Sequence, residues 1–280
     1  MIELATVSAS FPELRNLSAI PTPSGQKYVF TALLNGRKVV LKLIKLGQDR
    51  ERTLRETSAV KKLGCSFVPT IMDTGDRVVG TESLQFIIEE FIDGEDLCTR
   101  LRRAPRSPIN EVVSLGRALL RGCEEFEKAK LVHRDIKPAN IMIDKAGKVW
   151  IIDFGITRHL DLPTITPGGS FGPGTPGYAA PEQFRNLKTE INVRADLYST
   201  GVVVYEALNG SNPYLSILDP LQRLLYMEAN DLPPLIVQGP VTAELSRFLS
   251  SMTSRYPSRR PQSAAYAIDW FEKTVGAVNP

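Results

Sequence analysis

The first ninety residues alternate apolar and polar positions in the manner of β-strands. Two such segments, 28–34 and 38–46, flank Asn35-Gly36, a dipeptide typical of a tight turn between antiparallel strands. Side chains alternate between the two faces of a strand, so Lys42 shares its face with apolar neighbours on both sides. A buried lysine without a counter-charge is costly, and we therefore expect an acidic partner for Lys42.

Longer segments carry the spacing of helices. Residues 49–63 combine charges with strong helix formers, and residues 108–130 place apolar side chains three and four positions apart. Ser107 followed by proline is a typical helix start. A buried strand is predicted over 84–92, and residues 181–275 are predicted to be mostly helical.

The segment 164–177 interrupts these patterns, because it holds five glycines and three prolines in fourteen residues. This composition predicts a long loop rather than a helix or a central strand. Two short strands, 141–144 and 149–152, are predicted before it. Long loops inside compact domains usually have a function, so the segment is a candidate part of a site.

Composition and charge limit the classes of protein that remain. The chain has 280 residues, with 34 Lys and Arg against 31 Asp and Glu, and a net charge of +3 is too small for a nucleic-acid-binding surface. Its 42% apolar and 23% charged residues are typical of a globular protein. Three scattered cysteines and two histidines form no zinc-binding pattern and favour reduced thiols.

No segment predicts a signal peptide or a membrane span. The first fourteen residues lack a charged stretch followed by an apolar core, and the most apolar stretch, 201–208, is far shorter than the ~20 residues of a span. We therefore expect a soluble, cytoplasmic protein that contacts neither a membrane nor nucleic acid.

One segment brings together side chains that serve phosphate chemistry. It runs from His133 to Asn140 and places Asp135, Lys137 and Asn140 at positions i, i+2 and i+5, and Asp153-Phe-Gly follows eighteen residues after the first acid. The order and spacing match HRDxKxxN and DFG without a substitution. On these motifs the chain resembles the eukaryotic-type (Hanks-type) serine/threonine protein kinase family, from about residue 20 to about residue 275.

The resemblance implies an α+β, bilobal fold with one catalytic domain. An N-terminal extension would occupy 1–20, a small β-rich N-lobe 21–92 and a larger, mainly helical C-lobe 93–280. ATP and Mg²⁺ would bind between the lobes. Little of the chain lies outside the resemblance, so no sensor or membrane segment is expected.

The resemblance also implies roles for the motif residues. Asp135 would orient the attacking hydroxyl and accept its proton, and Lys137 would neutralise the transferred γ-phosphate. Asn140 and Asp153 would bind Mg²⁺ through oxygen ligands. Lys42 would bind the α- and β-phosphates.

Further residues would support these groups. Glu56, on the predicted helix after Lys42, matches the family position of the acid that pairs with that lysine. Val60 would pack in a spine with His133 and Phe154. The residues with a structural role are His133, Phe154, Glu182, Asp196 and Arg260. Of these, Asp196 would bind the backbone of the catalytic loop, and Glu182 would pair with Arg260.

The glycine-rich segment resembles the substrate loop of the serine/threonine branch. Thr175, in Gly174-Thr-Pro-Gly-Tyr178, would bond to Asp135 and Lys137. Arg134 before the catalytic aspartate is typical of kinases switched by phosphorylation. The candidate phosphosites are Thr164, Thr166 and Ser170.

The phosphate-binding loop departs from the family pattern. The family's three glycines would fall at positions 22, 24 and 27, where this chain has Thr, Ser and Lys, and only Gly25 lies in the loop. Either Ser24 and Gly25 form the turn while Lys27 or Gln26 contacts phosphate, or the loop closes poorly and lowers ATP affinity. Ser24 is a further candidate for autophosphorylation.

The adenine site contains a second departure. Adenine would be bound by the backbone of Glu90 and Ile92, with Val40 on one side and Ile141 or Met142 on the other. This register places Glu89 at the gatekeeper position, where apolar side chains or threonine are usual. A carboxylate there should find a partner or carry a raised pKa.

Two other functions remain open beside a kinase that acts on proteins. A pseudokinase, used as a nucleotide-binding scaffold, would agree with the glycine-poor loop but not with the intact motifs. A small-molecule phosphotransferase of the aminoglycoside type shares the catalytic layout, but it does not require the segments around Thr175 and Glu182.

The expected partners are a protein substrate and a separately encoded regulator. Arginines 100, 102, 103 and 106 form either a solvated helix end or a docking patch for an acidic partner.

Overall fold

In a computed structural model, contacts divide the chain into two units. The first unit contains Met1–Asp93 with 156–161, and the second contains Gly94–Gly155 and Leu162–Pro280. The described residues are 2–21, 27–45, 57–58, 60–61, 63–154, 164–166, 169–170, 174–185, 191–235 and 240–276, with the backbone alone at 164–166, 169–170 and 240–242.

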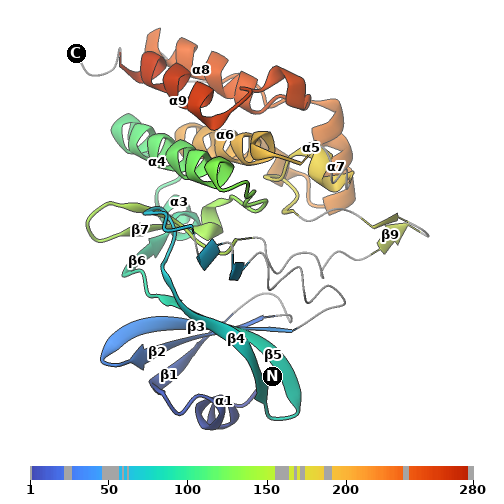
Figure 1. Ribbon diagram of the computed structural model, residues 1–280. Helices are drawn as coiled ribbons and strands as arrows, with labels where there is room; N and C mark the ends of the chain where they lie inside the picture. Colours follow the sequence, from blue (N-terminus) through green and yellow to red (C-terminus); the bar gives the residue numbers. More distant parts are fainter. Residues whose placement is uncertain are drawn as a thin grey trace. The chain divides into compact units, whose positions relative to one another are not determined.

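The first unit is built on a five-stranded antiparallel sheet with the order β1-β2-β3-β5-β4 (Figure 1). Its strands are β1 (Leu14–Ile20), β2 (Lys27–Leu34), β3 (Arg37–Lys45), β4 (Ile71–Val79) and β5 (Glu82–Glu90). Asn35 and Gly36 join β2 to β3 with φ of 50° and 78°. Both angles lie in the left-handed region that this two-residue turn requires, so the predicted hairpin is confirmed.

One face of this sheet packs against the N-terminal helix α1 (Leu4–Ser10). Val7 and Phe11 are fully buried there, together with the β3 residues that alternate with Lys42. The guanidinium of Arg77, on β4, lies 4.3 Å from the centre of the Phe11 ring and donates to the carbonyl oxygen of Ser10 at 3.0 Å. The N-terminal residues therefore fold onto the sheet, which the sequence pattern did not predict.

Of the helix predicted over 49–63, only residues 57, 58, 60 and 61 are described as helical.

The second unit is mainly helical. It begins with a small antiparallel sheet of order β6-β7-β8, formed by β6 (Gly94–Asp96), β7 (Ile141–Asp144) and β8 (Val149–Ile151). The α-helices are α3 (Leu97–Arg103), α4 (Ile109–Lys128), α5 (Pro181–Phe184), α6 (Val193–Asn209), α7 (Pro220–Ala229), α8 (Pro240–Met252) and α9 (Ala264–Val275). Among the described residues of this unit, 3₁₀ turns occupy Pro138–Asn140, Pro213–Ser216 and Pro257–Arg259.

Helix α6 forms the centre of this unit and packs against α4, α8 and α9 (Figure 1). Its residues are buried almost all round, whereas α4 buries only its apolar side. Helix α4 begins at Ile109, after Pro108 as its N-cap, one residue later than predicted. A Cβ on Gly116 would lie 2.8 Å from the ring of Phe271, so a glycine is required where α4 meets α9.

The glycine-rich segment differs in part from the predicted loop. Thr164–Thr166 (β9) and Gly169–Ser170 (β10) pair as a short two-stranded antiparallel ribbon.

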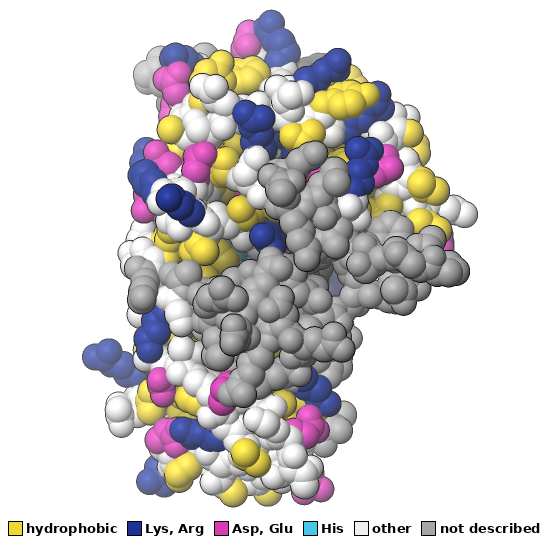
Figure 2. Space-filling view, turned by 45° about the vertical axis from the view of Figure 1, so that its right-hand side comes forward, with side chains coloured by type: hydrophobic (Ala, Val, Ile, Leu, Met, Phe, Trp, Pro, Cys, Tyr) yellow, Lys and Arg dark blue, Asp and Glu magenta, His cyan; other side chains and the backbone are white. Residues whose placement is uncertain are grey.

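Among the helices of the described residues, none combines the length and the apolar character of a membrane span. On the face shown in Figure 2, basic, acidic and apolar side chains of the described residues are interspersed.

Candidate active site

The lysine predicted to bind phosphate pairs with an acid inside its own sheet. The Nζ atom of Lys42, on β3, forms an ion pair with Oε1 of Glu89, on the neighbouring strand β5. Both residues are buried, with 8% and 9% of their surface exposed. The expectation that each of these two charges has a partner is confirmed. Glu56, the partner predicted for Lys42, lies outside the described residues.

The rest of the predicted nucleotide-binding set is described in part. Ser24 and Gly25 lie outside the described residues, whereas Lys27 begins β2 opposite Ile44. Val40 is half-buried and lies opposite Glu89 across β3 and β5.

One backbone group of the predicted adenine-binding segment is hydrogen-bonded within the protein. The backbone N–H of Glu90 donates to the carbonyl oxygen of Thr70 at 2.9 Å, so this donor is already used within the first unit. Ile92 is buried in the first unit, and Met142 is half-buried on β7 of the second unit.

The catalytic-loop residues of the second unit converge on the carboxylate of Asp135. Asn140 donates from Nδ2 to Oδ2 of Asp135 at 2.7 Å and to its carbonyl oxygen at 2.9 Å. Lys137 Nζ lies 3.0 Å from the same Oδ2. Thr175 donates its hydroxyl to Oδ1 at 2.8 Å and accepts from Lys137 at 3.0 Å. An acid, a cation, an amide and a hydroxyl therefore form one network, and Asp135 itself is 5% exposed.

The backbone of this loop is fixed from two helices. Asp196, fully buried on α6, accepts from the backbone N–H of His133 at 2.7 Å and of Arg134 at 2.8 Å. Burial raises the pKa of Asp196 to about 6, and these two bonds act in the opposite direction. Gln183, on α5, donates to the carbonyl oxygen of Arg134 at 2.9 Å. The predicted anchoring by Asp196 is confirmed, and Gln183 is a second anchor that the motifs did not indicate.

The two predicted metal ligands come from segments that are hydrogen-bonded to each other. The N–H of Ile152 donates to the carbonyl oxygen of Asn140 at 2.9 Å, and Asp153 is the next residue. Because the amide nitrogen of Asn140 is bonded to Asp135, its amide oxygen is the atom left for a cation. Arg134 and Asp153 have φ of 66° and 59°, left-handed conformations that concentrate at functional sites. These oxygen donors fit Mg²⁺.

His133 packs between aromatic rings and does not act as an acid or base in this geometry. Its ring centre lies 4.6 Å from that of Phe154 and 5.9 Å from that of Phe126. Its Nδ1 accepts from the backbone N–H of Asp135 at 3.3 Å, so Nε2, 3.1 Å from the carbonyl oxygen of Ile152, carries the proton. Burial lowers the pKa of His133 to about 4. The predicted packing of His133 with Phe154 is confirmed; Val60 lies in the first unit.

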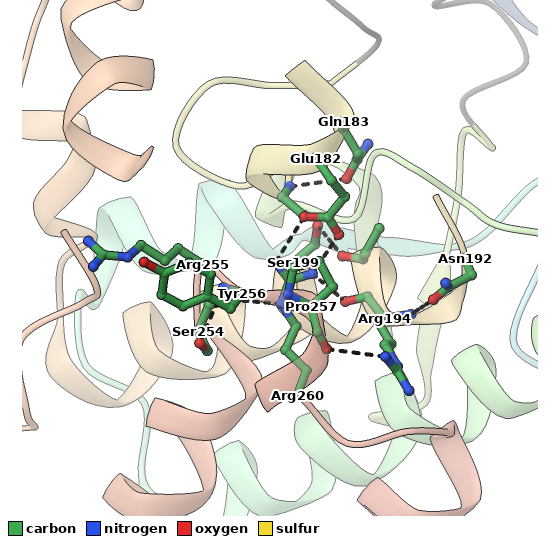
Figure 3. Close-up of polar contacts among 12 residues, drawn as sticks. Glu182, Gln183, Asn192, Arg194, Ser199, Ser254, Arg255, Tyr256, Pro257 and Arg260 are labelled. Carbon is green, nitrogen blue, oxygen red and sulfur yellow. Dashed lines mark hydrogen bonds and ion pairs between the residues drawn. The ribbon is translucent and has the colours of Figure 1, made fainter. Parts of the chain in front are cut away.

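Arg260 and Glu182 form a buried ion pair (Figure 3). The guanidinium nitrogens Nη1 and Nη2 bond the two carboxylate oxygens at 2.6 and 2.9 Å. Arg260 also donates to the carbonyl oxygens of Ser254 at 2.7 Å and Arg194 at 3.0 Å. The pairing predicted from the sequence is confirmed, and it connects α5, α6 and the segment before α9.

The segment from Gly174 to Tyr178 is bonded to α6, to α7 and to the loop between them by residues that no motif indicated. Tyr178 donates to Oε2 of Glu206 at 2.7 Å, and Asn212 donates to the carbonyl oxygen of Gly177 at 2.9 Å. Arg223 donates to the carbonyl oxygen of Pro176 at 3.0 Å. Burial raises the pKa of Glu206.

Two remaining expectations concern flanking residues. Thr164 and Thr166 lie on β9 and Ser170 on β10, and only their backbone is described. The arginines after β6 bond to nearby groups: Arg100 to Glu111 at 2.5 Å, Arg103 to Glu95 at 2.8 Å, Arg102 to Thr99 at 3.0 Å and Arg106 to the carbonyl oxygen of Asn209 at 3.1 Å. These contacts favour the solvated helix end over the docking patch.

The chain is similar in sequence to known proteins. Residues 24–271 match the family model of the protein kinase domain. The chain is 29% identical over 237 residues to a probable serine/threonine-protein kinase of Streptomyces coelicolor, and 30% identical over 239 residues to the serine/threonine-protein kinase PknB of Mycolicibacterium smegmatis. Each alignment covers 82% of this chain, and 35% and 37% of those proteins. The chain thus spans about a third of the length of these relatives.

The fold also has a solved counterpart. The crystal structure of the Mycobacterium tuberculosis PknI kinase domain matches 93% of this chain and 97% of its own, with a TM-score of 0.65 and 21% identity. At this identity the likeness concerns the fold, and it confirms the predicted α+β class. Because the family model extends over most of the residues, and the motif side chains of the second unit form one network, the chain belongs to the protein kinase domain family.

Proposed function

We propose that the chain is a serine/threonine protein kinase that transfers the γ-phosphate of ATP to a protein hydroxyl. The observation that carries the proposal is the network around Asp135. Its carboxylate is bonded to Lys137, Asn140 and Thr175, and the backbone before it is fixed by Asp196. Phosphoryl transfer depends mainly on positioning and charge stabilisation, and a network of this kind supplies both.

The reaction exchanges one bond to phosphorus for another. The substrate hydroxyl oxygen bonds to the γ-phosphorus, the bond from that phosphorus to the bridging oxygen breaks, and ADP leaves. Asp135 orients the hydroxyl and accepts its proton. Lys137, 3.0 Å from Asp135 Oδ2, places a positive charge beside the transferred group. Proton transfer to a positioned base typically contributes about 10²–10⁴-fold in rate.

Asn140 and Asp153 would bind Mg²⁺ through the amide and carboxylate oxygens. The bound ion supplies positive charge that neutralises the phosphate oxygens. Lys42 would bind the α- and β-phosphates. Ser24, Gly25 and Lys27 belong to the proposed phosphate-binding loop, and Val40, Glu90, Ile92 and Met142 to the proposed adenine site.

The environment of Thr175 supports a protein substrate. Thr175 is bonded to both catalytic-loop residues, and the three residues after it are bonded to Glu206, Asn212 and Arg223. Such a segment provides a fixed backbone against which an extended peptide can lie.

We further propose that the protein phosphorylates itself, at one or more of Thr164, Thr166, Ser170 and Ser24. A separately encoded regulator stays a prediction.

The function can be tested by following labelled γ-phosphate from ATP, with Mg²⁺, into a generic basic protein. Asp135→Asn should lower the rate by about 10²–10⁴-fold, because the amide keeps the shape but cannot accept the proton. Asp269→Asn, which breaks an exposed pair with Lys273 on α9, serves as the control and should not change the rate. Binding of ATP without transfer would favour a pseudokinase. Label that appears only on a small metabolite would favour a small-molecule phosphotransferase.

A further inference from the structure

The ion pair between Lys42 and Glu89 is formed by two neighbouring strands of one sheet. In the register of β3 and β5, Glu89 lies opposite Val40 and Lys42 lies opposite Ile87. The two charged residues are therefore diagonal neighbours on the same face, where long side chains reach each other. The Nζ atom of Lys42 contacts Oε1 of Glu89 directly.

The surroundings of the pair strengthen the attraction between its charges. Lys42 and Glu89 are 8% and 9% exposed, and Ile87 and Ile44, on the same sheet face, are 5% and 2% exposed. Buried charges are screened by salt and water much less than exposed ones. Glu89 thus offsets the charge of the Lys42 ammonium through a direct contact.

The acid is placed on a rigid element. Strand β5 is paired on one side with β3 and on the other with β4, so Glu89 lies on a strand held between two neighbours. Lysine, in contrast, carries its charge on a flexible four-carbon chain. The ammonium can therefore turn from the carboxylate to another anion, whereas the carboxylate stays where β5 places it.

We propose that Glu89 competes with nucleotide phosphate for the ammonium of Lys42 and thereby sets the affinity of the protein for ATP. The inference rests on the proposed function, in which Lys42 binds the α- and β-phosphates. Carboxylate and phosphate oxygens accept from the same N–H donors. The free energy needed to separate Lys42 from Glu89 is lost from nucleotide binding, as for any ligand that must displace an internal contact. Glu89 acts through Lys42 and is a positioning residue.

The test compares Glu89→Gln with the wild type in calorimetric titrations with a non-hydrolysable ATP analogue and Mg²⁺. Glutamine keeps the shape of the side chain but removes its charge. The variant should bind the analogue at least about fivefold more tightly, the lower end of typical coupling between sites. Adenosine, which has no phosphate, should bind the two proteins alike. A gain of affinity cannot result from misfolding.

Two further variants make the result specific. Glu82→Gln breaks the exposed pair of Lys45 with Glu82, 3.2 Å apart on the same two strands, and should leave affinity for the analogue unchanged. In a Lys42→Met background, Glu89→Gln should produce no gain.

Three results would overturn the inference: unchanged or weaker binding of the analogue by Glu89→Gln, an equal gain for adenosine, or a gain that persists without Lys42. The first two would leave the proposed function intact if the wild type binds the analogue and Lys42→Met weakens that binding. Failure of both the wild type and Glu89→Gln to bind the analogue would instead overturn the proposed function.

Discussion

At the scale of single residues, Thr175 connects the glycine-rich segment to the catalytic carboxylate. Its hydroxyl donates to Asp135 and accepts from Lys137, so it fixes both groups at once. We predict that Thr175→Ala lowers kcat/KM about ten- to a hundredfold, the value of one or two hydrogen bonds to charged groups. Thr175→Ser retains the hydroxyl and should remain close to the wild type in steady-state kinetics. Equal losses in the two variants would contradict a role for the hydroxyl.

His133 makes the stability of the protein depend on pH. Burial lowers its pKa to about 4, below its ordinary value of 6.5, so the folded protein keeps the ring neutral where the unfolded chain binds a proton. Its contribution is complete above pH 6.5 and is lost as the pH falls toward 4. The lost free energy of unfolding reaches about 3 kcal/mol.

The pH effect is measured by chemical denaturation of the wild type and His133→Phe between pH 7 and 4. Phenylalanine keeps an aromatic ring beside Phe126 and Phe154 but cannot titrate. Asp196 has a pKa raised to about 6, and its contribution is lost as pH rises from its ordinary value of 3.8, which is the opposite direction. Both proteins contain Asp196, so its contribution cancels when the pH dependence of one is subtracted from that of the other. Parallel stability curves over this pH range would contradict the assignment.

At the scale of elements, the pair of Glu182 and Arg260 fastens α5 to the segment that leads into α9. The pair is buried and bidentate, and Arg260 also bonds two carbonyl oxygens (Figure 3). Arg260→Met leaves the carboxylate buried without its cation and should cost about 3–5 kcal/mol of unfolding free energy. Arg260→Lys keeps the charge but loses the fork geometry, and should cost about 1–3 kcal/mol.

Denaturation by urea measures both changes, with Arg259→Lys as the matched control. Arg259 is the exposed neighbour of Arg260, so its conversion to lysine should be close to neutral. If Arg260→Met were as stable as this control, the buried pair would not contribute as described.

The elements that the sequence predicted well are those with local signals. The hairpin of β2 and β3 follows from Asn35-Gly36 and strand alternation, and α4 follows from apolar residues at helical spacing. Helix α1 and strand β4 were not predicted, because their place depends on contacts between distant residues. Arg77, for example, joins β4 to Ser10 and the Phe11 ring across more than sixty positions of the chain.

The same distinction applies to the candidate site. Asp135, Lys137, Asn140 and Asp153 could be found because their types and spacing form a motif. Gln183, Glu206, Asn212 and Arg223 could not, because each acts through a bond to the backbone or side chain of a residue distant in the sequence. The pairing of Lys42 with Glu89 needed the strand register, which alternation alone does not provide.

At the scale of the whole molecule, the chain combines a β-rich unit and a helical unit, each with its own part of the predicted chemistry. Lys42 and Glu89 belong to the first unit, and the network around Asp135 belongs to the second. The alignments cover 35% and 37% of the curated relatives, so the remaining segments of those proteins say nothing about this chain. Its substrates and regulation therefore have to be established on the protein itself.

We propose that the network around Asp135 transfers phosphate to serine or threonine. The most direct measurement is mass spectrometry of the intact and digested protein after incubation with ATP and Mg²⁺, alone and with a generic basic protein. We predict phosphate on serine or threonine in the wild type, at sites among those proposed, and incorporation at least about a hundredfold slower with Asp135→Asn. Absence of phosphate from all proteins incubated with the wild type, or equal phosphorylation by Asp135→Asn, would contradict phosphate transfer by this network.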